Sequence, residues 1–561
     1  MNAPRLRHAL IAPALMALVS CASADWPAFR HDALRTGAQP KASPLSDPVK
    51  VKKLQVVWRF PKEGEPNLGE GFRASPIVHK GRVFIGNGSG FFYALDAKTG
   101  EKIWQYPPVG SLALDSQFHC NPSSHGIASS ATIAKIRGTD AVIFAAPDPS
   151  IGKHFGDGRL FALKTRTGEV IWKSPLIARL NGCTKECKSE FHENLGHSSP
   201  LVLGDKVYVG VGDHCDNPIQ KGRVVAVYLR TGLIVSRFRY CSTGKCNDTD
   251  TTRGGGVWSP PAGLQDSVYI TTGNTQSGQD FEPYPNYGLS LLRLDAATGK
   301  VLWSFQPVPW NLDGDPDWAA APTIMSTSCG LVVISTQKDG WTHAVNATDG
   351  TWRWSFPPRP SPPFPPFRCG DGTCHGDLRY MRSGAAWGNV YVTMNGGADL
   401  TTSNDGTGGY RRLHAFNVCE PEEKNRLRWV IDVPETCCAL DDQNCDCCLS
   451  SCCGSDCRYR LGNPTVTHGI FYIGTHKGHL LVIADPAVAS HAGLRCSSPD
   501  VQNESCDLMG YRLVPQPQVL KDIALHGSMA YTEPVLANGK VYVSTDASAS
   551  HEGGYVYMLQ P

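Results

Sequence analysis

A phrase that recurs along the whole chain constrains its fold more than any other feature. Each full copy has Thr-Gly or Asp-Gly in its middle and tryptophan at its end, at Ala94–Trp104 (ALDAKTGEKIW), Ala162–Trp172, Arg293–Trp303 and Ala344–Trp354. A copy without the tryptophan spans Ala226–Phe238, and a lengthened one spans Ala415–Trp429. Because glycine tolerates positive φ, the middle predicts a tight turn between two strands. We expect each tryptophan to fill the gap between neighbouring units.

A second pattern precedes each phrase and predicts another strand pair. Segments such as SPIVHKGRVFIGNGSG and EPVLANGKVYVSTD alternate apolar and polar residues around glycine-containing turns. Such units begin near Ser75, Ala131, Ser199, Ser259, Ala321, Ser383, Asn463 and Glu533. The last unit lacks the tryptophan phrase, and Leu54–Phe60 (LQVVWRF) can supply its missing strand. The sequence therefore predicts an all-β fold, an eight-bladed β-propeller closed by an N-terminal strand, which leaves no open sheet edge.

The first residues have the form of a secretory signal peptide. Arg5 and Arg7 precede an apolar run that ends in small residues at Ala24. Two processing routes remain open, because Leu18-Val19-Ser20-Cys21 resembles a lipobox, whereas Ala22-Ser23-Ala24 resembles a cleavage site that would free Asp25. We expect residues 1–24 to be the signal and residues 25–561 to form one exported propeller. It would lie in the periplasm, or be anchored to the envelope through a lipidated Cys21.

Cysteine usage supports export. The chain has 21 cysteines, and an even number remains once Cys21 is set aside. Behind a signal peptide, this predicts disulfides in an oxidising compartment. Pairs that lie close in sequence are Cys183/Cys187, Cys241/Cys246, Cys369/Cys374 and Cys496/Cys506.

Three insertions interrupt the repeats, and the net charge of the chain bears on the ligands it can bind. Residues 357–367 form a proline-rich insertion, and residues 436–458 and 490–507 form cysteine-rich ones. We favour disulfides over zinc in the cysteine-rich segment. The chain has 53 Lys and Arg against 51 Asp and Glu, so loss of Arg5 and Arg7 with the signal leaves no net charge. A neutral chain lacks the basic surface that nucleic-acid binding requires.

The recurring phrases resemble the pyrroloquinoline-quinone (PQQ) repeat, and the opening DWPAFRHDALRTG (Asp25–Gly37) is similar to the lead-in of such proteins. The resemblance covers essentially the whole mature chain. Members of this family are either quinoprotein dehydrogenases, which oxidise alcohols, or propellers that act as scaffolds.

The resemblance implies a cofactor site in the middle of the chain. Gly254–Asn274 looks like the segment in which Trp258 lies flat under the quinone and Asn274 ligates Ca²⁺. DPDWAAAP resembles the segment that carries the catalytic carboxylate, which is Asp317, with Asp315 as the alternative. Lys338 stands where a basic residue contacts the quinone oxygens, as in the poly(vinyl alcohol) dehydrogenase-like branch.

The chain also departs from the family pattern. A calcium-binding glutamate is missing from the third unit, where Asp213 or Asp216 could replace it. Adjacent cysteines that cap the quinone in many relatives are missing too, since that region has only Cys120. No C-x-x-C-H haem motif is present, and the spacing from Cys369 to His375 favours a disulfide loop over haem.

Two functions of different classes follow. The first is an exported quinoprotein that oxidises an alcohol or a hydroxylated polymer by hydride transfer to PQQ and passes electrons to a separate acceptor such as a cytochrome. The second is a non-catalytic envelope propeller that binds proteins or glycans. We favour the dehydrogenase, because Trp258, Asn274, Asp317 and Lys338 occur in the family's order.

Overall fold

A computed structural model describes most of the predicted repeat domain. The described residues are 24–41, 43–66, 68–113, 126–149, 158–178, 195, 197–212, 221–244, 246, 254–274, 287–307, 317–338, 341–356, 383–394, 412–432, 461–486, 517–529, 531–546 and 554–561. Residues 1–23 lie outside this set, so the signal peptide and the lipobox at Cys21 stay predictions. Among the described residues, no helix has the length and hydropathy that a membrane span requires.

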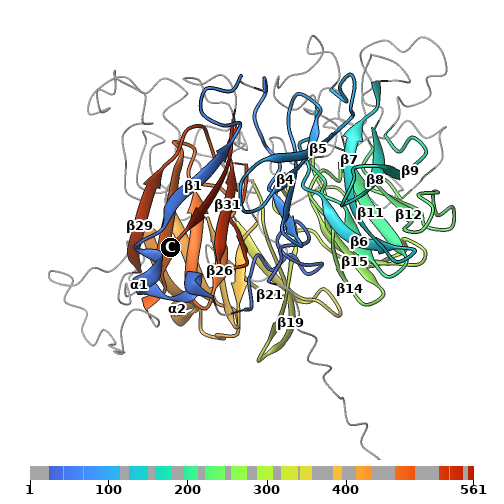
Figure 1. Cartoon of the computed structure of the whole chain (residues 1–561). Helices are drawn as coiled ribbons and strands as arrows, with labels where there is room; N and C mark the ends of the chain where they lie inside the picture. The colour runs from blue at the N-terminus through green and yellow to red at the C-terminus, as the bar shows by residue number, and fades with distance from the viewer. Residues whose placement is uncertain are drawn as a thin grey trace, which may run out of the picture.

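The structure is a ring of eight antiparallel sheets with four strands each, which confirms the predicted eight-bladed propeller (Figure 1). The first strand of each blade is the innermost one. Inner strands of adjacent blades contact one another from blade 2 round to blade 8, and the inner strand of blade 8 contacts that of blade 1.

Strands follow chain order within the first four blades. Blade 1 comprises β2 (Ile77–His79), β3 (Arg82–Gly86), β4 (Phe92–Asp96) and β5 (Lys102–Tyr106). Blade 2 comprises β6 (Thr132–Ile136), β7 (Thr139–Pro147), β8 (Gly158–Lys164) and β9 (Val170–Lys173). Blade 3 comprises β10 (Leu201–Leu203), β11 (Lys206–Val211), β12 (Arg223–Tyr228) and β13 (Tyr240–Cys241). Blade 4 comprises β14 (Ala262–Leu264), β15 (Ser267–Thr271), β16 (Leu291–Asp295) and β17 (Val301–Phe305).

The next three blades repeat this order, and the last one departs from it. Blade 5 comprises β18 (Thr323–Thr327), β19 (Gly330–Thr336), β20 (Thr342–Asn346) and β21 (Trp352–Phe356). Blade 6 comprises β22 (Ala385–Trp387), β23 (Val390–Met394), β24 (Arg412–Asn417) and β25 (Leu427–Asp432). Blade 7 comprises β26 (Thr465–Thr467), β27 (Ile470–Gly474), β28 (His479–Ala484) and β29 (Gln518–Ala524). Blade 8 comprises β30 (Val535–Ala537), β31 (Lys540–Ser544), β32 (Val556–Gln560) and β1 (Gln55–Phe60). The described helices are short: a 3₁₀ turn at Pro44–Ser46, α1 (Pro48–Val51) and α2 (Glu423–Arg426).

An N-terminal strand closes the ring, as predicted. β1 pairs antiparallel with the C-terminal strand β32, with Gln55 opposite Gln560 and Phe60 opposite Val556. Because the two strands come from opposite ends of the chain, this ladder leaves the last blade with four strands like the others. The ladder ties the two ends of the chain together within one sheet and so closes the ring.

The recurring phrase makes the contact between neighbouring blades. Trp104 of blade 1 packs against Gly168 of blade 2, where an added Cβ would lie 2.8 Å from the indole ring. Its indole N–H also donates to the Thr165 carbonyl at 3.2 Å. Trp58 of β1 packs in the same way on Gly100 of blade 1, so the closing contact repeats the others. Glycine is required at these turns both for its positive φ and for this close approach.

The segment Ala24–Gln39, here called the N-terminal segment, runs through the middle of the ring. Its backbone exchanges hydrogen bonds with inner-strand residues such as Val78, Ile324 and Val466, which belong to blades 1, 5 and 7. In blade 3, the backbone carbonyls of Ser199 and Pro200 accept hydrogen bonds from Arg35 Nη2 at 3.4 and 3.2 Å. The other four blades donate backbone N–H groups to the carbonyls of this segment. The donors are Ile133 of blade 2, Gly263 of blade 4, Ala386 of blade 6 and Asn538 of blade 8, so the segment contacts every blade.

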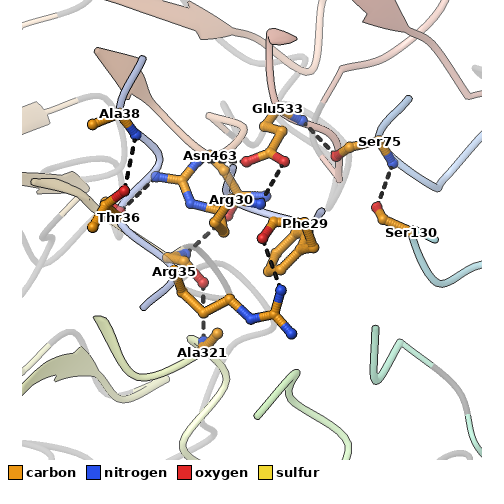
Figure 2. Close-up of polar contacts among 12 residues, drawn as sticks. Phe29, Arg30, Arg35, Thr36, Ala38, Ser75, Ser130, Ala321, Asn463 and Glu533 are labelled. Atoms are coloured by element: carbon orange, nitrogen blue, oxygen red, sulfur yellow. Dashed lines mark hydrogen bonds and ion pairs between the residues drawn. The ribbon is translucent and has the colours of Figure 1, made fainter. Parts of the chain in front are cut away.

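Two buried arginines hold this segment (Figure 2). Arg30 Nη1 lies 2.7 Å from Glu533 Oε2, and neither side chain is exposed to solvent. The same carboxylate accepts the Arg30 backbone N–H at 2.9 Å. Within the described part of the chain, the Arg35 guanidinium donates to backbone carbonyls, among them those of Pro261 at 2.8 Å and Phe29 at 2.9 Å. Because a buried charge is costly unless it is hydrogen-bonded, these contacts define one position for the segment.

Disulfides are present in the described residues. Cys241 pairs with Cys246, which was one of the pairs that lie close in sequence. Cys329 pairs with Cys419 and joins the β18–β19 turn of blade 5 to the end of β24 in blade 6. The three other neighbouring pairs, the proline-rich insertion and both cysteine-rich insertions lie outside the described residues.

Candidate active site

The candidate residues sit at equivalent places in two adjacent blades. Trp258 precedes the inner strand β14, and Asn274 follows β15, the second strand of the same hairpin. Asp317 and Lys338 stand in the same relation to β18 and β19. Because the two strands of a hairpin run in opposite directions, the residue before the first and the residue after the second meet at one end. All four therefore lie on the same face of the ring.

Backbone hydrogen bonds continue the hairpins beyond their strands and bring these residues together. Lys338 N donates to the Asp317 carbonyl at 2.8 Å. In blade 4, Gly255 N donates to the Asn274 carbonyl at 2.6 Å. The two blades are then joined by Ser259 Oγ, which donates to the Trp318 carbonyl at 3.0 Å.

A buried ion pair is the central polar feature. Lys338 Nζ lies 2.7 Å from Asp317 Oδ2, and the two side chains are 4% and 3% exposed. Asp317 Oδ1 is buried and has no hydrogen-bond partner among the described residues. The pair thus compensates the charge of the aspartate and leaves one of its oxygens for a group that enters the site.

Trp258 and Asn274 border this ion pair. Lys338 Nζ lies 5.4 Å from the centre of the Trp258 ring. A Cβ placed on Gly273 would lie 2.9 Å from Asp317 Oδ1 and 3.2 Å from Trp258 Nε1, so both side chains crowd the same glycine. Asn274 is the next residue and is buried. The structure therefore brings together all four of these predicted residues.

The remaining predicted site residues are not described. Asp315, Asp213 and Asp216 fall in gaps of the described chain, as does Cys120. β11 ends at Val211 in blade 3, and this end of the strand lies on the same face of the ring as the other candidates. Within the described residues, no group of three His, Cys, Asp or Glu side chains is arranged to hold a metal.

A cavity adjoins Trp258 and extends across the ring axis. Its lining residues come from most blades and from the N-terminal segment: Phe29, Arg73, Ser75, Ala128, Ser130, His197, Ser199, Trp258, Ser259, Pro260, Ala319, Ser383, Asn463 and Tyr531. Phe29 shows that the N-terminal segment forms part of the wall. Sequence reasoning missed Arg73, Tyr531 and the contribution of this segment, although the serine that begins several repeat units was a visible signal.

These residues fit a quinone carboxylate and a divalent cation in chemical terms. Trp258 offers an aromatic face, Lys338 and Arg73 offer positive charge, and the oxygens of Asn274 and Asp317 are hard donors of the kind that Ca²⁺ prefers. The described donors number fewer than the six to eight oxygens usual for Ca²⁺, so a complete site requires Asp213, Asp216 or water.

Comparisons with known proteins agree with this fold. The family described as the PQQ "glucose/ethanol/alcohol dehydrogenase, beta-propeller domain" matches residues 26–364. Relatives include the quinoprotein alcohol dehydrogenase PedH of Pseudomonas putida, 23% identical over 55% of this chain and 51% of the relative. The quinoprotein glucose dehydrogenase of Escherichia coli is 25% identical over 62% of this chain and 45% of the relative. The chain thus spans about half the length of the curated relatives it matches.

Solved structures share the fold. The quinohemoprotein alcohol dehydrogenase of Comamonas testosteroni superposes with a TM-score of 0.59 at 16% identity, over 95% of this chain and 80% of that chain. A europium-containing methanol dehydrogenase superposes with a TM-score of 0.57 at 15% identity, over 96% of this chain and 98% of that chain. The matched family model covers more than half of the sequence and includes Trp258, Asn274, Asp317 and Lys338. This chain belongs to the PQQ family of glucose, ethanol and alcohol dehydrogenase β-propeller domains.

Proposed function

We propose that the chain is an exported quinoprotein dehydrogenase that oxidises an alcohol with PQQ and Ca²⁺. The observation that carries this proposal is the buried Asp317–Lys338 pair beside Trp258 and Asn274. Family membership and the dehydrogenase relatives support the same reaction class. When bound, PQQ supplies the two-electron acceptor and Ca²⁺ the Lewis acid.

Asp317 would act as the general base. Lys338 Nζ lies 2.7 Å from Oδ2, and Oδ1 is the oxygen left to accept a proton. The hydroxyl proton of the alcohol would move to Asp317. At the same time, a hydrogen on the carbon that bears the hydroxyl would leave as hydride. The products are an aldehyde or ketone, the protonated aspartate and the two-electron-reduced cofactor.

Other residues would hold the reactants. Trp258 would support the planar ring by stacking, and Lys338 would also contact the quinone oxygens. Asn274 would donate its amide oxygen to Ca²⁺, together with Asp213 or Asp216. The Lys338 assignment stays compatible with a poly(vinyl alcohol) dehydrogenase-like protein, and a hydroxylated polymer remains part of the proposed substrate range.

Electrons would leave through a separate acceptor, because the sequence has no C-x-x-C-H motif. One relative is a 1-butanol dehydrogenase that uses cytochrome c, which supports a cytochrome as the acceptor here. We place the reaction outside the cytoplasm because of the predicted signal peptide.

Substitution of Asp317 by asparagine tests the base directly. The wild-type protein, reconstituted with PQQ and Ca²⁺, should reduce an artificial dye in the presence of alcohols. Asp317→Asn should lower kcat by about 10²–10⁴-fold, the usual contribution of a general base, while it still binds PQQ. Asp315→Asn is the matched control and should keep wild-type activity. Equal activity of wild type and Asp317→Asn would exclude this base, and loss confined to Asp315→Asn would move the role there.

A further inference from the structure

Blade 5 has a histidine at a core position that most other blades fill with an aliphatic or aromatic side chain. His343 belongs to β20, the third strand of the blade, and lies opposite Ser335 of the second strand. The equivalent residues in the other third strands are Tyr93, Phe161, Val225, Leu292, His414, Leu481 and Tyr557. Because a buried polar group is costly unless it is hydrogen-bonded, packing alone does not explain an imidazole here.

Two hydrogen bonds hold the His343 ring, which is buried. Its Nε2 lies 3.1 Å from Gln337 Oε1, and its Nδ1 lies 2.7 Å from Ser355 Oγ. Because an amide oxygen can only accept, Nε2 carries the hydrogen, and in the neutral ring Nδ1 accepts the hydrogen of the Ser355 hydroxyl. The imidazole is therefore held from both sides in one orientation.

His343 contacts the chain neighbour of each member of the buried ion pair. Gln337, which accepts the Nε2 hydrogen, immediately precedes Lys338. Trp318 immediately follows Asp317, and the centre of its ring lies 5.4 Å from the centre of the His343 ring. Gln337 and Trp318 also pair with each other in an antiparallel bridge. One side chain thus supports the two residues from which Lys338 and Asp317 extend.

The geometry of the ion pair depends on this bridge. Lys338 N donates to the Asp317 carbonyl at 2.8 Å, which continues the bridge by one residue. The side chains then meet, with Lys338 Nζ 2.7 Å from Asp317 Oδ2. A displacement of Gln337 relative to Trp318 would therefore move both charged groups. Since a displacement of about 1 Å can lower the rate of an enzyme about 10²-fold, the support matters for a reaction at this pair.

We infer that His343 is a positioning residue for the Asp317–Lys338 pair. It acts through Gln337 and Trp318 rather than on the reacting atoms. Its effect on catalysis rests on the proposed function, whereas the position of Lys338 can be measured in the protein without a cofactor.

Substitution by phenylalanine tests the effect on catalysis. His343→Phe removes both hydrogen bonds but keeps an aromatic ring, which blade 2 has at the same place in Phe161. In the full chain loaded with PQQ and Ca²⁺, it should lower kcat about 10- to 100-fold, while KM for the alcohol and the affinity for PQQ stay near those of wild type. His343→Gln should restore part of the kcat, because its amide N–H can donate to Gln337 Oε1.

His414→Phe is the matched control. His414 occupies the equivalent place in blade 6, which contains none of the four candidate site residues, and it is as buried as His343. This variant should keep the kcat of wild type.

Pulse acetylation of the cofactor-free chain tests the position of Lys338 directly. The modification of Lys338 is compared by mass spectrometry with that of Lys221 in blade 3, a lysine that is also buried. In His343→Phe, the acetylation of Lys338 relative to Lys221 should rise about 10-fold, because weaker support exposes the buried amine more often. His414→Phe should leave this ratio unchanged.

The outcomes separate this role from the proposed function. A wild-type protein that oxidises no alcohol would overturn the proposed function, and the acetylation ratio would still test the support of Lys338. In His343→Phe, an unchanged ratio or a kcat equal to that of wild type would overturn the positioning role. Equal losses in His343→Phe and His414→Phe would also overturn it, because both histidines would then serve only the packing of their blades.

Discussion

At the scale of single residues, the Asp317–Lys338 pair shows how the fold holds two opposite charges in a buried site. Both side chains are almost fully buried, and each charge is tolerated because the other is within hydrogen-bond distance. A buried pair of this kind contributes little net stability, but the loss of one partner is costly. The pair is therefore better explained by a role in the site than by a role in folding.

Lys338→Met separates these two roles. It should lower the free energy of unfolding by about 3–5 kcal/mol, because it leaves the Asp317 carboxylate buried without its cation. The double variant Lys338→Met/Asp317→Asn should recover most of this loss, since it removes both charges. Urea unfolding of wild type, the two single variants and the double variant measures the coupling. Additive losses in the double variant would show that the two side chains do not interact as described.

At the scale of elements, the N-terminal segment stands out. Repeat patterns did not predict its path, because it contains no strand and its partners are inner strands far away in sequence. Arg30 and Glu533, for example, are separated by 503 residues. Its similarity to the lead-in of the family was visible, but only the structure shows that the segment contacts every blade and that Phe29 reaches the cavity.

Glu533→Gln tests the anchoring of this segment. Glu533 accepts from the Arg30 backbone and side chain, so neutralising it should cost about 3–5 kcal/mol of stability by leaving Arg30 buried without a counter-charge. Glu101→Gln is the control, because the Glu101 pair with Lys62 is exposed and should contribute at most about 1 kcal/mol. Thermal and urea unfolding measure both changes. A Glu533→Gln variant no less stable than Glu101→Gln would contradict the anchoring.

At the scale of the whole molecule, the repeats explain why so much of the fold could be predicted. The Thr-Gly turn and the tryptophan encode the contact between blades, and LQVVWRF encodes the closing strand. The order of Trp258, Asn274, Asp317 and Lys338 along consecutive blades also predicted their proximity, because equivalent positions lie on one face. The disulfide between Cys329 and Cys419 was missed, since their separation of 90 residues gives no local signal.

Arg73 could not be predicted for a related reason. Its partner Asp546 is 473 residues away, and the two meet only because the ring closes between blades 8 and 1. A lone arginine before a strand is ordinary in sequence. It becomes significant when closure places it in the wall of the cavity that Trp258 also lines. Ring closure thus contributes to the site as well as to stability.

Binding of PQQ beside Trp258 is the central claim, and tryptophan fluorescence measures it most directly. The mature chain should show saturable quenching by PQQ that is stronger with Ca²⁺ than without it. Trp258→Ala should lose most of this quenching, whereas Trp352→Phe, which alters a tryptophan in β21 of blade 5 outside the cavity lining, should keep it. Quenching that is absent in wild type, or equal in wild type and Trp258→Ala, would contradict the claim and favour a propeller that binds proteins or glycans without a cofactor.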